Sequence, residues 1–349
     1  MKEESYFKQR DEKNILKLRE LRLKLPAFCS EFFMGMEYLT TPLTRVGYAN
    51  DLKIFFEFLT SNISEFIGKK TEDLIVSDLE KITATHLEMF LDYLNIYKIG
   101  KRTFRNGEKA KSRKLSSVRS LLKYFFKREK VSRNVATLVD TPKLHESEIV
   151  RLEVDEVVRL LDLSEDGVSL TPMQKGFHKH TKDRDFAILT LFLGTGIRIS
   201  ECVGLNIEDI DFSVNGFTVT RKGGNRVILY FGDEVADALK KYIVLRNNIK
   251  ELPPTECALF ISLQNRRMSV RAVEKLVKKY AQIVTPLKHI TPHKLRSTYG
   301  TNLYRETNDI YAVAAVLGHK DVNTTRKHYA AMSEDIRRGV ANKVKLRKE

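Results

Sequence analysis

The chain has 349 residues, with 61 Lys and Arg against 45 Asp and Glu, so its formal net charge is +16. This length accommodates one large domain or two, and 42% hydrophobic residues suffice for packed cores. The positive charge favours a polyanionic partner, with nucleic acid first and an anionic membrane surface second.

Two further patterns narrow the class of protein. No apolar run approaches the roughly 18–20 residues that a membrane span needs, and residues 1–22 lack the apolar core of a signal peptide. The cysteines Cys29, Cys202 and Cys257 are far apart and show no Cys-x-x-Cys spacing, which argues against a disulfide framework and a zinc ribbon. We therefore expect a cytoplasmic protein with reduced thiols and no membrane partner.

The first 140 residues predict helices. Residues 1–25 form a helical extension that Pro26 ends. The next segment places apolar residues on one helix face: Tyr48, Leu52, Phe55, Phe56 and Leu59. A later segment repeats the pattern: Val118, Leu121, Leu122, Phe125 and Phe126.

Residues 98–133 concentrate the positive charge. They hold 14 Lys and Arg and only Glu108 and Glu129 as acids, so this segment carries +12 of the +16. A solvated helix face is the simpler interpretation of any one of these cations, but so one-sided a concentration is typical of phosphate contact. A membrane-surface helix is disfavoured because residues 101–114 hold almost no large apolar residue. We predict nine DNA-binding residues here: Lys101, Arg102, Arg105, Lys111, Arg113, Lys114, Arg119, Lys123 and Lys127.

A polar stretch at 142–150 predicts a linker between a helical domain at 26–141 and a second domain at 151–349. The second domain is expected to begin with a short helix from residue 152 and an irregular loop at 163–181. A buried helix at 186–193 follows, and the sequence Gly-Thr-Gly ends it.

The hydrophobic period then changes from helical to alternating. Three short segments, at 209–212, 217–221 and 226–231, are separated by Asn-Gly and Gly-Gly-Asn turn signals. They predict a small three-stranded antiparallel sheet. Helices resume at 233–246 and after Ser269, a predicted N-cap.

Five polar features in the second half could carry chemistry. The first is Arg198, which follows a tight turn and lies three residues before Glu201; an ordinary surface ion pair is the alternative. The second is Lys222, beside two glycines at the tip of the second predicted hairpin, where a plain exposed lysine is the alternative.

The third feature is His293 with Arg296, which share a face in the first turn of a helix that Thr291 and Pro292 begin. Free backbone N–H groups favour an anion at such a helix start. The fourth is His319 after a helix at 310–317, although a lone histidine is more often structural.

The fifth feature is Tyr329, which lies among polar and basic residues and is poorly explained by packing. The combined set has two arginines, a lysine, two histidines and a tyrosine, without metal-ligand spacing. It suits phosphoryl transfer, because fixed cations stabilise the charge on a pentacoordinate phosphate. Two guanidinium groups can bind its oxygens bidentately, and a tyrosine oxygen can act as a covalent nucleophile.

In order and local context, these motifs resemble the tyrosine recombinases, which include phage integrases and bacterial Xer proteins. The family pattern is an arginine in a Gly-x-Arg-x-x-Glu turn, a hairpin lysine, His-x-x-Arg, Leu-Gly-His and a C-terminal tyrosine. Every element has its counterpart here. The ten residues from His319 to Tyr329 are one more than in many members, but no other tyrosine in that segment competes as nucleophile.

The resemblance implies a mainly α protein: a helical core-type DNA-binding domain and a mostly helical catalytic domain with a small three-stranded antiparallel sheet. It implies that Tyr329 attacks a scissile phosphate, forms a 3′-phosphotyrosyl link and releases a 5′-hydroxyl, while Glu201 orients the site. The link conserves the phosphodiester energy, so no ATP, metal or other cofactor is expected.

The same resemblance implies a role for each remaining residue. Arg198 and Arg296 clamp the non-bridging oxygens, and His319 donates a further hydrogen bond to them. Lys222 protonates the departing 5′-oxygen, and His293 assists proton removal from the tyrosine.

The implied partners are double-stranded DNA carrying a specific site and further copies of the chain. The tail at 332–349 has apolar residues at steps of four, and in similar proteins it packs on a neighbouring protomer; a helix packed on its own domain is the alternative. We expect a homo-tetramer on two duplexes that exchanges its tails. The site-specific task, whether integration, excision or dimer resolution, stays open.

Three other functions compete with this interpretation. A type IB topoisomerase uses much the same residues, but the N-terminal layout and the Leu-Gly-His sequence favour a recombinase. A DNA-binding relative that has lost catalysis is disfavoured by the complete residue set. An RNA-binding module is the weakest alternative, since no pattern typical of one is present.

Overall fold

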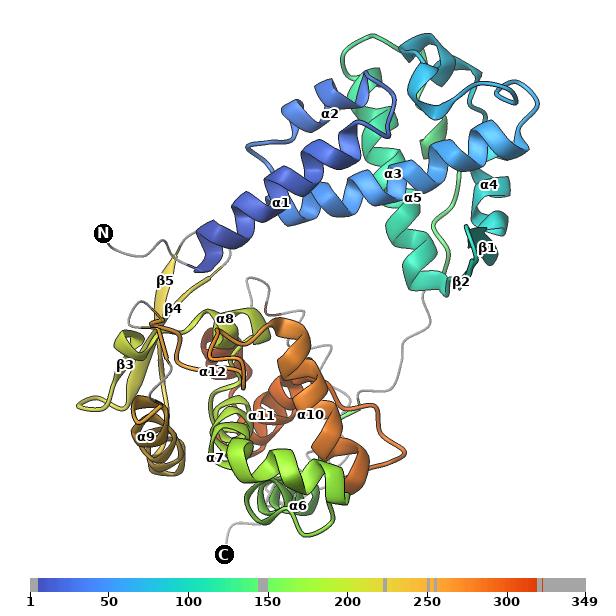
Figure 1. Cartoon of the computed structure of the whole chain (residues 1–349). Helices are drawn as coiled ribbons and strands as arrows, with labels where there is room; N and C mark the ends of the chain where they lie inside the picture. The colour runs from blue at the N-terminus through green and yellow to red at the C-terminus, as the bar shows by residue number, and fades with distance from the viewer. Residues whose placement is uncertain are drawn as a thin grey trace, which may run out of the picture. The chain divides into compact units, whose positions relative to one another are not determined.

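The computed structural model describes residues 6–143, 150–221, 225–249, 252–253, 256–318 and 322. The chain divides into two compact units, Met1–Ser147 and Glu148–Glu349. Both units are mainly helical, as expected (Figure 1). Within the described ranges, no helix is long and apolar enough to cross a bilayer.

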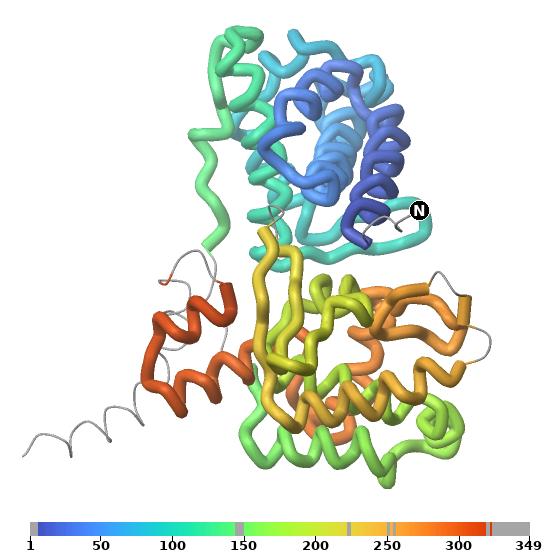
Figure 2. The backbone as a smooth tube through the Cα atoms, turned by 90° about the vertical axis from the view of Figure 1, so that its left-hand side faces the viewer, coloured from blue at the N-terminus to red at the C-terminus, as the bar shows by residue number. Residues whose placement is uncertain are grey.

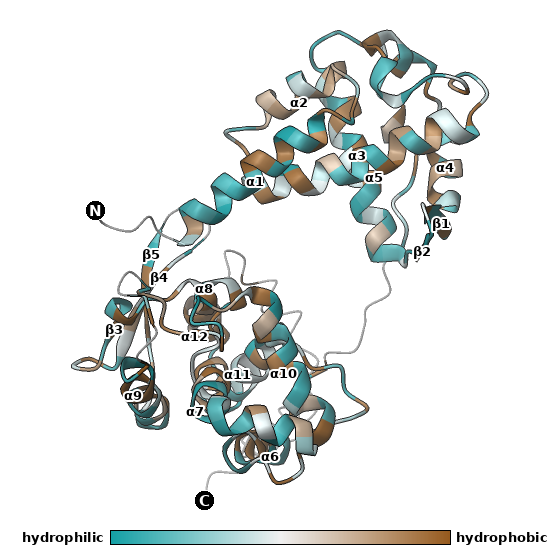
Figure 3. Cartoon of the chain, in the orientation of Figure 1, coloured by the Kyte–Doolittle hydropathy of each residue, from teal (hydrophilic) through white to brown (hydrophobic). Residues whose placement is uncertain are grey.

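The first unit is built from helices and one short hairpin. Its helices are α1 (Tyr6–Arg22), α2 (Cys29–Gly35), α3 (Pro42–Asn62), α4 (Ala84–Tyr93) and α5 (Glu108–Phe126), with short 3₁₀ segments at Thr71–Asp73, Val76–Lys81 and Val135–Thr137. The start of α3 is encoded locally: Pro42 occupies its first turn, and the Thr41 hydroxyl accepts a hydrogen bond from the Thr44 N–H at 3.3 Å. Figure 3 shows hydrophilic and hydrophobic residues along α1 and α5, as helices with one buried face require.

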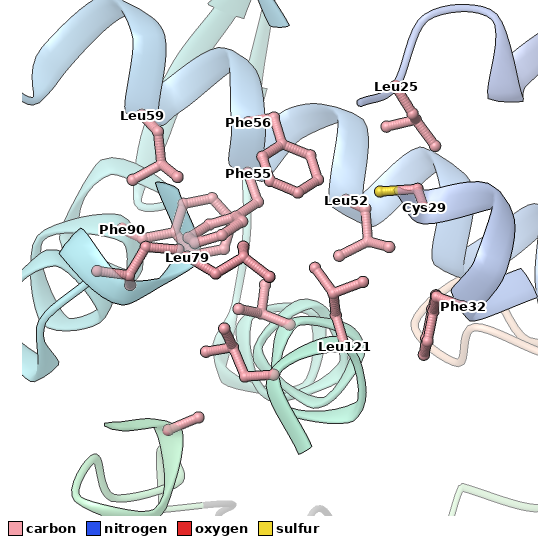
Figure 4. Packing of buried hydrophobic residues seen from close by; sticks show 14 of the residues in the cluster. Leu25, Cys29, Phe32, Leu52, Phe55, Phe56, Leu59, Leu79, Phe90 and Leu121 are labelled. Atoms are coloured by element: carbon pink, nitrogen blue, oxygen red, sulfur yellow. The ribbon is translucent and has the colours of Figure 1, made fainter. Parts of the chain in front are cut away.

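The core of the first unit lies between the two apolar faces that the sequence predicts. The predicted α3 residues from Leu52 to Leu59 and the predicted α5 residues from Val118 to Phe125 are buried in one cluster (Figure 4). Phe126 is the exception, with 43% of its surface exposed at the end of α5. Leu18 and Leu25 belong to the same cluster and α1 packs on α3, so the described part of the N-terminal segment contributes to the core of this unit.

A hairpin interrupts the helices and corrects the prediction of helices alone before residue 140. Strands β1 (Ile96–Ile99) and β2 (Arg102–Arg105) pair antiparallel, and the rings of Tyr97 and Phe104 stack with centroids 5.4 Å apart. Gly100 makes the turn with a φ of 56°. Four-residue strands rich in cations give too short an alternation to be recognised in the sequence.

The second unit holds seven helices among its described residues and the predicted three-stranded sheet. The helices are α6 (Val154–Asp166), α7 (Pro172–Thr195), α8 (Ile199–Gly204), α9 (Asp233–Asn247), α10 (Val270–Val284), α11 (Pro292–Thr307) and α12 (Ile310–Leu317), with a 3₁₀ turn at Ile207–Asp209. Strands β3 (Ile210–Asp211), β4 (Gly216–Thr220) and β5 (Arg226–Tyr230) form an antiparallel sheet in that order. Figure 2 shows β4 and β5 (yellow) running as neighbours along the hairpin.

The prediction of an irregular loop at 163–181 is wrong, because most of this segment is helical. Helix α6 continues to Asp166 and ends at Gly167 with a φ of 67°, and α7 begins at Pro172. The Thr171 hydroxyl accepts from the Gln174 N–H at 3.3 Å, while the Gln174 side chain accepts from the Thr171 N–H at 3.0 Å. This reciprocal cap makes the proline a helix start instead of a loop signal. Helix α7 then continues through the buried segment expected at 186–193 and ends at Gly196.

Candidate active site

The last turn of α12 is where two of the predicted site residues, Arg198 and Arg296, meet. Gly318 ends the helix with a φ of 62°, the left-handed conformation in which glycine is favoured. The final carbonyls of a helix lack intrahelical partners and form the negative end of its dipole. They therefore attract cations, and arginine side chains from other elements bind them.

Arg198 reaches this turn from the N-cap of α8. Its Nη2 donates to the carbonyls of Leu317 at 3.2 Å and Gly318 at 3.1 Å. Its Nη1 donates to Glu201 Oε1 at 2.8 Å, and its backbone N–H donates to Glu201 Oε2 at 3.0 Å. The Arg198–Glu201 ion pair is therefore present, but Glu201 is only 4% exposed, so it is not the ordinary surface pair offered as the alternative.

Arg296 reaches the same turn from α11. It is 5% exposed, and its guanidinium donates to the carbonyls of Gly196 and Leu317. Arg198 and Arg296 therefore share one acceptor, the Leu317 carbonyl. Gly196, with a φ of 61°, ends α7 two residues before Arg198, so a single turn supplies one arginine and binds the other.

The start of α11 differs in one detail from the prediction. Pro292 is in its first turn, but the Thr291 side chain makes no cap hydrogen bond. His293 is exposed in that turn, three residues before Arg296, as the spacing predicts. Lys222, His319 and Tyr329 lie outside the described residues.

Sequence reasoning missed one residue of this region, Arg221. Its Nη2 donates to the Val316 carbonyl at 3.0 Å, and its Nε is buried without a hydrogen-bond partner among the described atoms. Burial lowers the pKa of Arg221; the nearby Glu201 carboxylate opposes this effect, and the Arg198 charge adds to it. The sequence feature that could have identified Arg221 is its position at the end of a predicted strand, next to Lys222.

In the first unit, two of the nine predicted DNA-binding residues are tied to buried groups. Arg113 donates to both carboxylate oxygens of Asp51, at 2.6 and 2.7 Å, and the Ser117 hydroxyl donates to the same carboxylate at 2.8 Å. Lys114 is buried and donates to Asn106 at 3.2 Å, and burial lowers the pKa of Lys114. These contacts give both cations a structural role within α5.

Two more of the nine make intramolecular contacts at the surface. Lys111 pairs with Glu108 at 3.0 Å. Arg119 donates to the carbonyls of Ala136 and Val139, which fixes the chain just before the stretch 142–150. The other five are exposed: Lys101, Arg102, Arg105, Lys123 and Lys127.

A hollow of about 490 Å³ lies beside α5 in the first unit. It is lined on the helix by Ser116, Arg119, Ser120 and Lys123, and on the other side by the 134–137 segment. The Ser116 and Ser120 hydroxyls and the Lys123 ammonium are donors suited to phosphate oxygens and base edges, whereas the Arg119 guanidinium is bound to the chain itself.

Comparison with known proteins gives the family. Residues 150–335 match the model of the phage integrase family, which is more than half of the chain. Tyrosine recombinase XerC of Caldanaerobacter subterraneus subsp. tengcongensis is 33% identical over 338 residues, which cover 94% of this chain and 89% of that relative. Tyrosine recombinase XerS of Lactococcus lactis subsp. lactis is 30% identical over 356 residues, covering 94% and 98% of the two chains.

Solved structures agree on the fold. The XerH site-specific recombinase bound to its difH substrate, in a pre-cleavage complex, superposes with a TM-score of 0.63 at 20% identity, covering 82% of this chain and 77% of that one. The family model, the identities over nearly the whole chain and the arginine pair agree. The chain belongs to the phage integrase family and is a tyrosine recombinase, an enzyme of site-specific DNA recombination.

Proposed function

We propose that the protein cuts and rejoins double-stranded DNA at a specific site through a 3′-phosphotyrosyl intermediate. The observation that carries the proposal is the pair of guanidinium groups, from Arg198 and Arg296, fixed on the one Leu317 carbonyl. Backbone carbonyls orient the Arg296 guanidinium without neutralising it as a carboxylate would. Arg198 is held by carbonyls and also by the Glu201 carboxylate, which leaves its side chain 36% exposed. Two fixed guanidiniums supply the donors that a phosphate needs as charge builds on its oxygens.

Cleavage is an exchange of one phosphorus–oxygen bond for another. The Tyr329 oxygen bonds to phosphorus as the bond to the 5′-oxygen breaks, so the phosphorus remains bonded to the 3′-oxygen of the DNA and is now also bonded to the tyrosine. His293 assists loss of the phenolic proton, and Lys222 delivers a proton to the departing oxygen. His319 adds a hydrogen bond to the non-bridging oxygens.

Rejoining runs the same exchange backwards with a different 5′-hydroxyl. The phosphotyrosyl bond keeps the energy of the phosphodiester, so neither ATP nor a metal ion enters the balance. Glu201 contributes by position: its buried carboxylate holds both the backbone and the side chain of Arg198. Strand exchange follows when the attacking hydroxyl comes from a second duplex.

The exposed cations of the first unit supply phosphate contacts in this proposal. Five are exposed and take no part in the intramolecular contacts described above: Lys101, Arg102, Arg105, Lys123 and Lys127. The remaining four, Lys111, Arg113, Lys114 and Arg119, shape the same surface through the contacts described above. Such contacts bind any sequence, so the polar groups around the hollow on α5 are where base recognition would be added.

The proposed working form is a homo-tetramer on two duplexes in the cytoplasm. Two sites must be held together for strands to exchange, and each site needs two cleavage events. We propose that the tails at 332–349 pass between protomers and couple assembly to cleavage, because the apolar residues there recur at steps of four.

The experiment that tests the function offers the protein two duplexes carrying the site, labelled with different dyes. Products that carry both labels are expected, because the 5′-hydroxyl of one duplex attacks the phosphotyrosyl bond of the other. A type IB topoisomerase would relax supercoiled DNA and give no such product. A relative without catalysis would bind the site and leave no covalent complex on a nicked duplex, so either result would contradict the proposal.

A further inference from the structure

Arg221 is fixed at its backbone by the sheet. Strands β4 and β5 pair up to the partners Thr220 and Arg226, and the Arg221 N–H then donates to the Asn225 carbonyl at 2.8 Å. Arg221 is therefore the last described residue of the β4 side that the hairpin hydrogen bonds hold. The next residue in the sequence is Lys222, the proposed proton donor.

The side chain of Arg221 leaves the sheet and binds the end of α12. Its Nη2 donates to the Val316 carbonyl, 95 residues away in the sequence, at 3.0 Å. Gly318 lies directly against the guanidinium, because a Cβ built at that position would overlap it. The left-handed φ and this close approach both require glycine at 318. The contact therefore depends on Gly318 as well as on Arg221.

Three guanidinium groups thus bind three successive carbonyls. Arg221 takes Val316, Arg296 takes Leu317, and Arg198 takes Leu317 and Gly318. Bringing like charges together in a partly buried place is unfavourable, and partial burial together with the nearby Arg198 charge lowers the pKa of Arg221. A methionine of similar length could fill the same space without that penalty, so packing alone does not explain an arginine here.

We propose that Arg221 is a positioning residue that ties the end of β4 to the last turn of α12. The two segments that leave these points begin with Lys222 and His319, so the tie sets where both segments start. The inference rests on the proposed function, since it assigns Arg221 an effect on proton delivery by Lys222. Among the described residues, the Arg221 side chain donates to the Val316 backbone carbonyl, so the role proposed for it acts through Lys222.

The test compares Arg221→Met with Arg226→Met in the full chain. Both changes remove one guanidinium from the same hairpin, but Arg226 is exposed and lies on β5. Each variant is given a nicked suicide duplex with either oxygen or sulfur at the bridging 5′ position, beside Lys222→Ala. Hydrogen exchange of the β4 and β5 amides is measured on the same samples.

Misplacing the donor should slow cleavage of the oxygen substrate in Arg221→Met by about ten- to a hundredfold. The sulfur substrate should be cleaved within about threefold of the unchanged protein, since a thiolate leaves without a proton. Lys222→Ala should show the same rescue. Exchange of the β4 and β5 amides should rise in Arg221→Met and stay unchanged in Arg226→Met.

Three outcomes would contradict either the positioning role of Arg221 or the acid role of Lys222. Equal defects of Arg221→Met on both substrates, with Lys222→Ala rescued, would overturn the positioning role and make Arg221 a phosphate contact. Unchanged cleavage and exchange would overturn the tie itself. Failure of sulfur to rescue Lys222→Ala would refute the acid role in the proposed function; faster exchange in Arg221→Met would then still support the tie, and unchanged exchange would refute it.

Discussion

Two arginines, one in each unit, are held by opposite means. Arg113 in α5 donates two short hydrogen bonds to the buried carboxylate of Asp51, which balances its charge locally. Arg296 in α11 donates to the carbonyls of Gly196 and Leu317, which orient the guanidinium but carry only partial charges. The difference teaches that the group holding a cation, more than the charge of the surrounding sequence, decides whether its charge is available to a phosphate.

The largest expected effect comes from replacing Arg296, the arginine that backbone carbonyls hold. Arg296→Lys keeps the charge but loses the planar fork that binds two acceptors. Cleavage of site DNA should fall by about a hundred- to a thousandfold, the usual loss for one fixed transition-state donor, while DNA binding is retained. Single-turnover cleavage on a suicide substrate measures it.

The second unit offers a matched control for this change. Arg246 is 4% exposed and also donates to two carbonyls, Ala258 at 2.9 Å and Glu256 at 2.6 Å, away from α12. Arg246→Lys should lower the thermal midpoint and leave cleavage per folded molecule unchanged. If both lysine variants lose cleavage equally, carbonyl-held guanidiniums serve only stability here.

An intermediate effect is expected for exposed cations of the first unit. Replacing Lys123 and Lys127 together by glutamine should flatten the salt dependence of DNA binding by about 0.9 log unit for each phosphate that the protein no longer binds. Lys130→Gln is the control, because Lys130 already pairs with Glu31 at 2.6 Å. A slope that both variants leave unchanged would mean that this face of α5 is only solvated.

The smallest effect concerns how the stability of the protein depends on pH through Asp78, a carboxylate of the first unit that holds two lysines. Burial raises the pKa of Asp78, but hydrogen bonds from Lys69, Lys81 and the Ile75 N–H outweigh it and lower the pKa to about 2. A lowered pKa in the folded state stabilises the protein above the unfolded value and loses that contribution as the pH falls towards about 2.

The corresponding experiment compares acid unfolding of the unchanged protein with that of Asp78→Asn. At neutral pH the substitution should cost about 1–2 kcal/mol, because both lysines are partly exposed and screened. The difference should shrink mainly as the pH falls from about 4, the pKa of an unfolded aspartate, towards the folded value of about 2. A difference that stays constant over this range would exclude the Asp78 ion pairs as its source.

Local signals predicted the parts of the molecule that depend on local sequence. The apolar faces of α3 and α5 and the strands of the three-stranded sheet follow from local sequence patterns. The loop assigned around Pro172 failed because proline also begins helices, as it does at Pro42 and Pro292. The hairpin at 96–105 was not predicted because its four-residue strands are too short to show an alternation of apolar and polar residues.

The site was predictable as a set of residues but not as a set of contacts. The motifs singled out Arg198 and Arg296, yet their meeting point is a carbonyl more than a hundred residues beyond Arg198. Arg221 was missed because its role depends on Val316, which no local pattern links to it. Likewise, nothing near Arg113 in the sequence indicates Asp51, 62 residues away.

The most direct test of the account is covalent trapping by the proposed nucleophile. On a nicked suicide duplex, the unchanged protein should form an adduct that resists SDS, and Tyr329→Phe should bind the same DNA and form none. Tyr311→Phe is the matched control, because Tyr311 is a 71% exposed tyrosine of α12, and it should trap DNA normally. An SDS-resistant adduct with Tyr329→Phe would contradict the account, since another residue would then carry the phosphate.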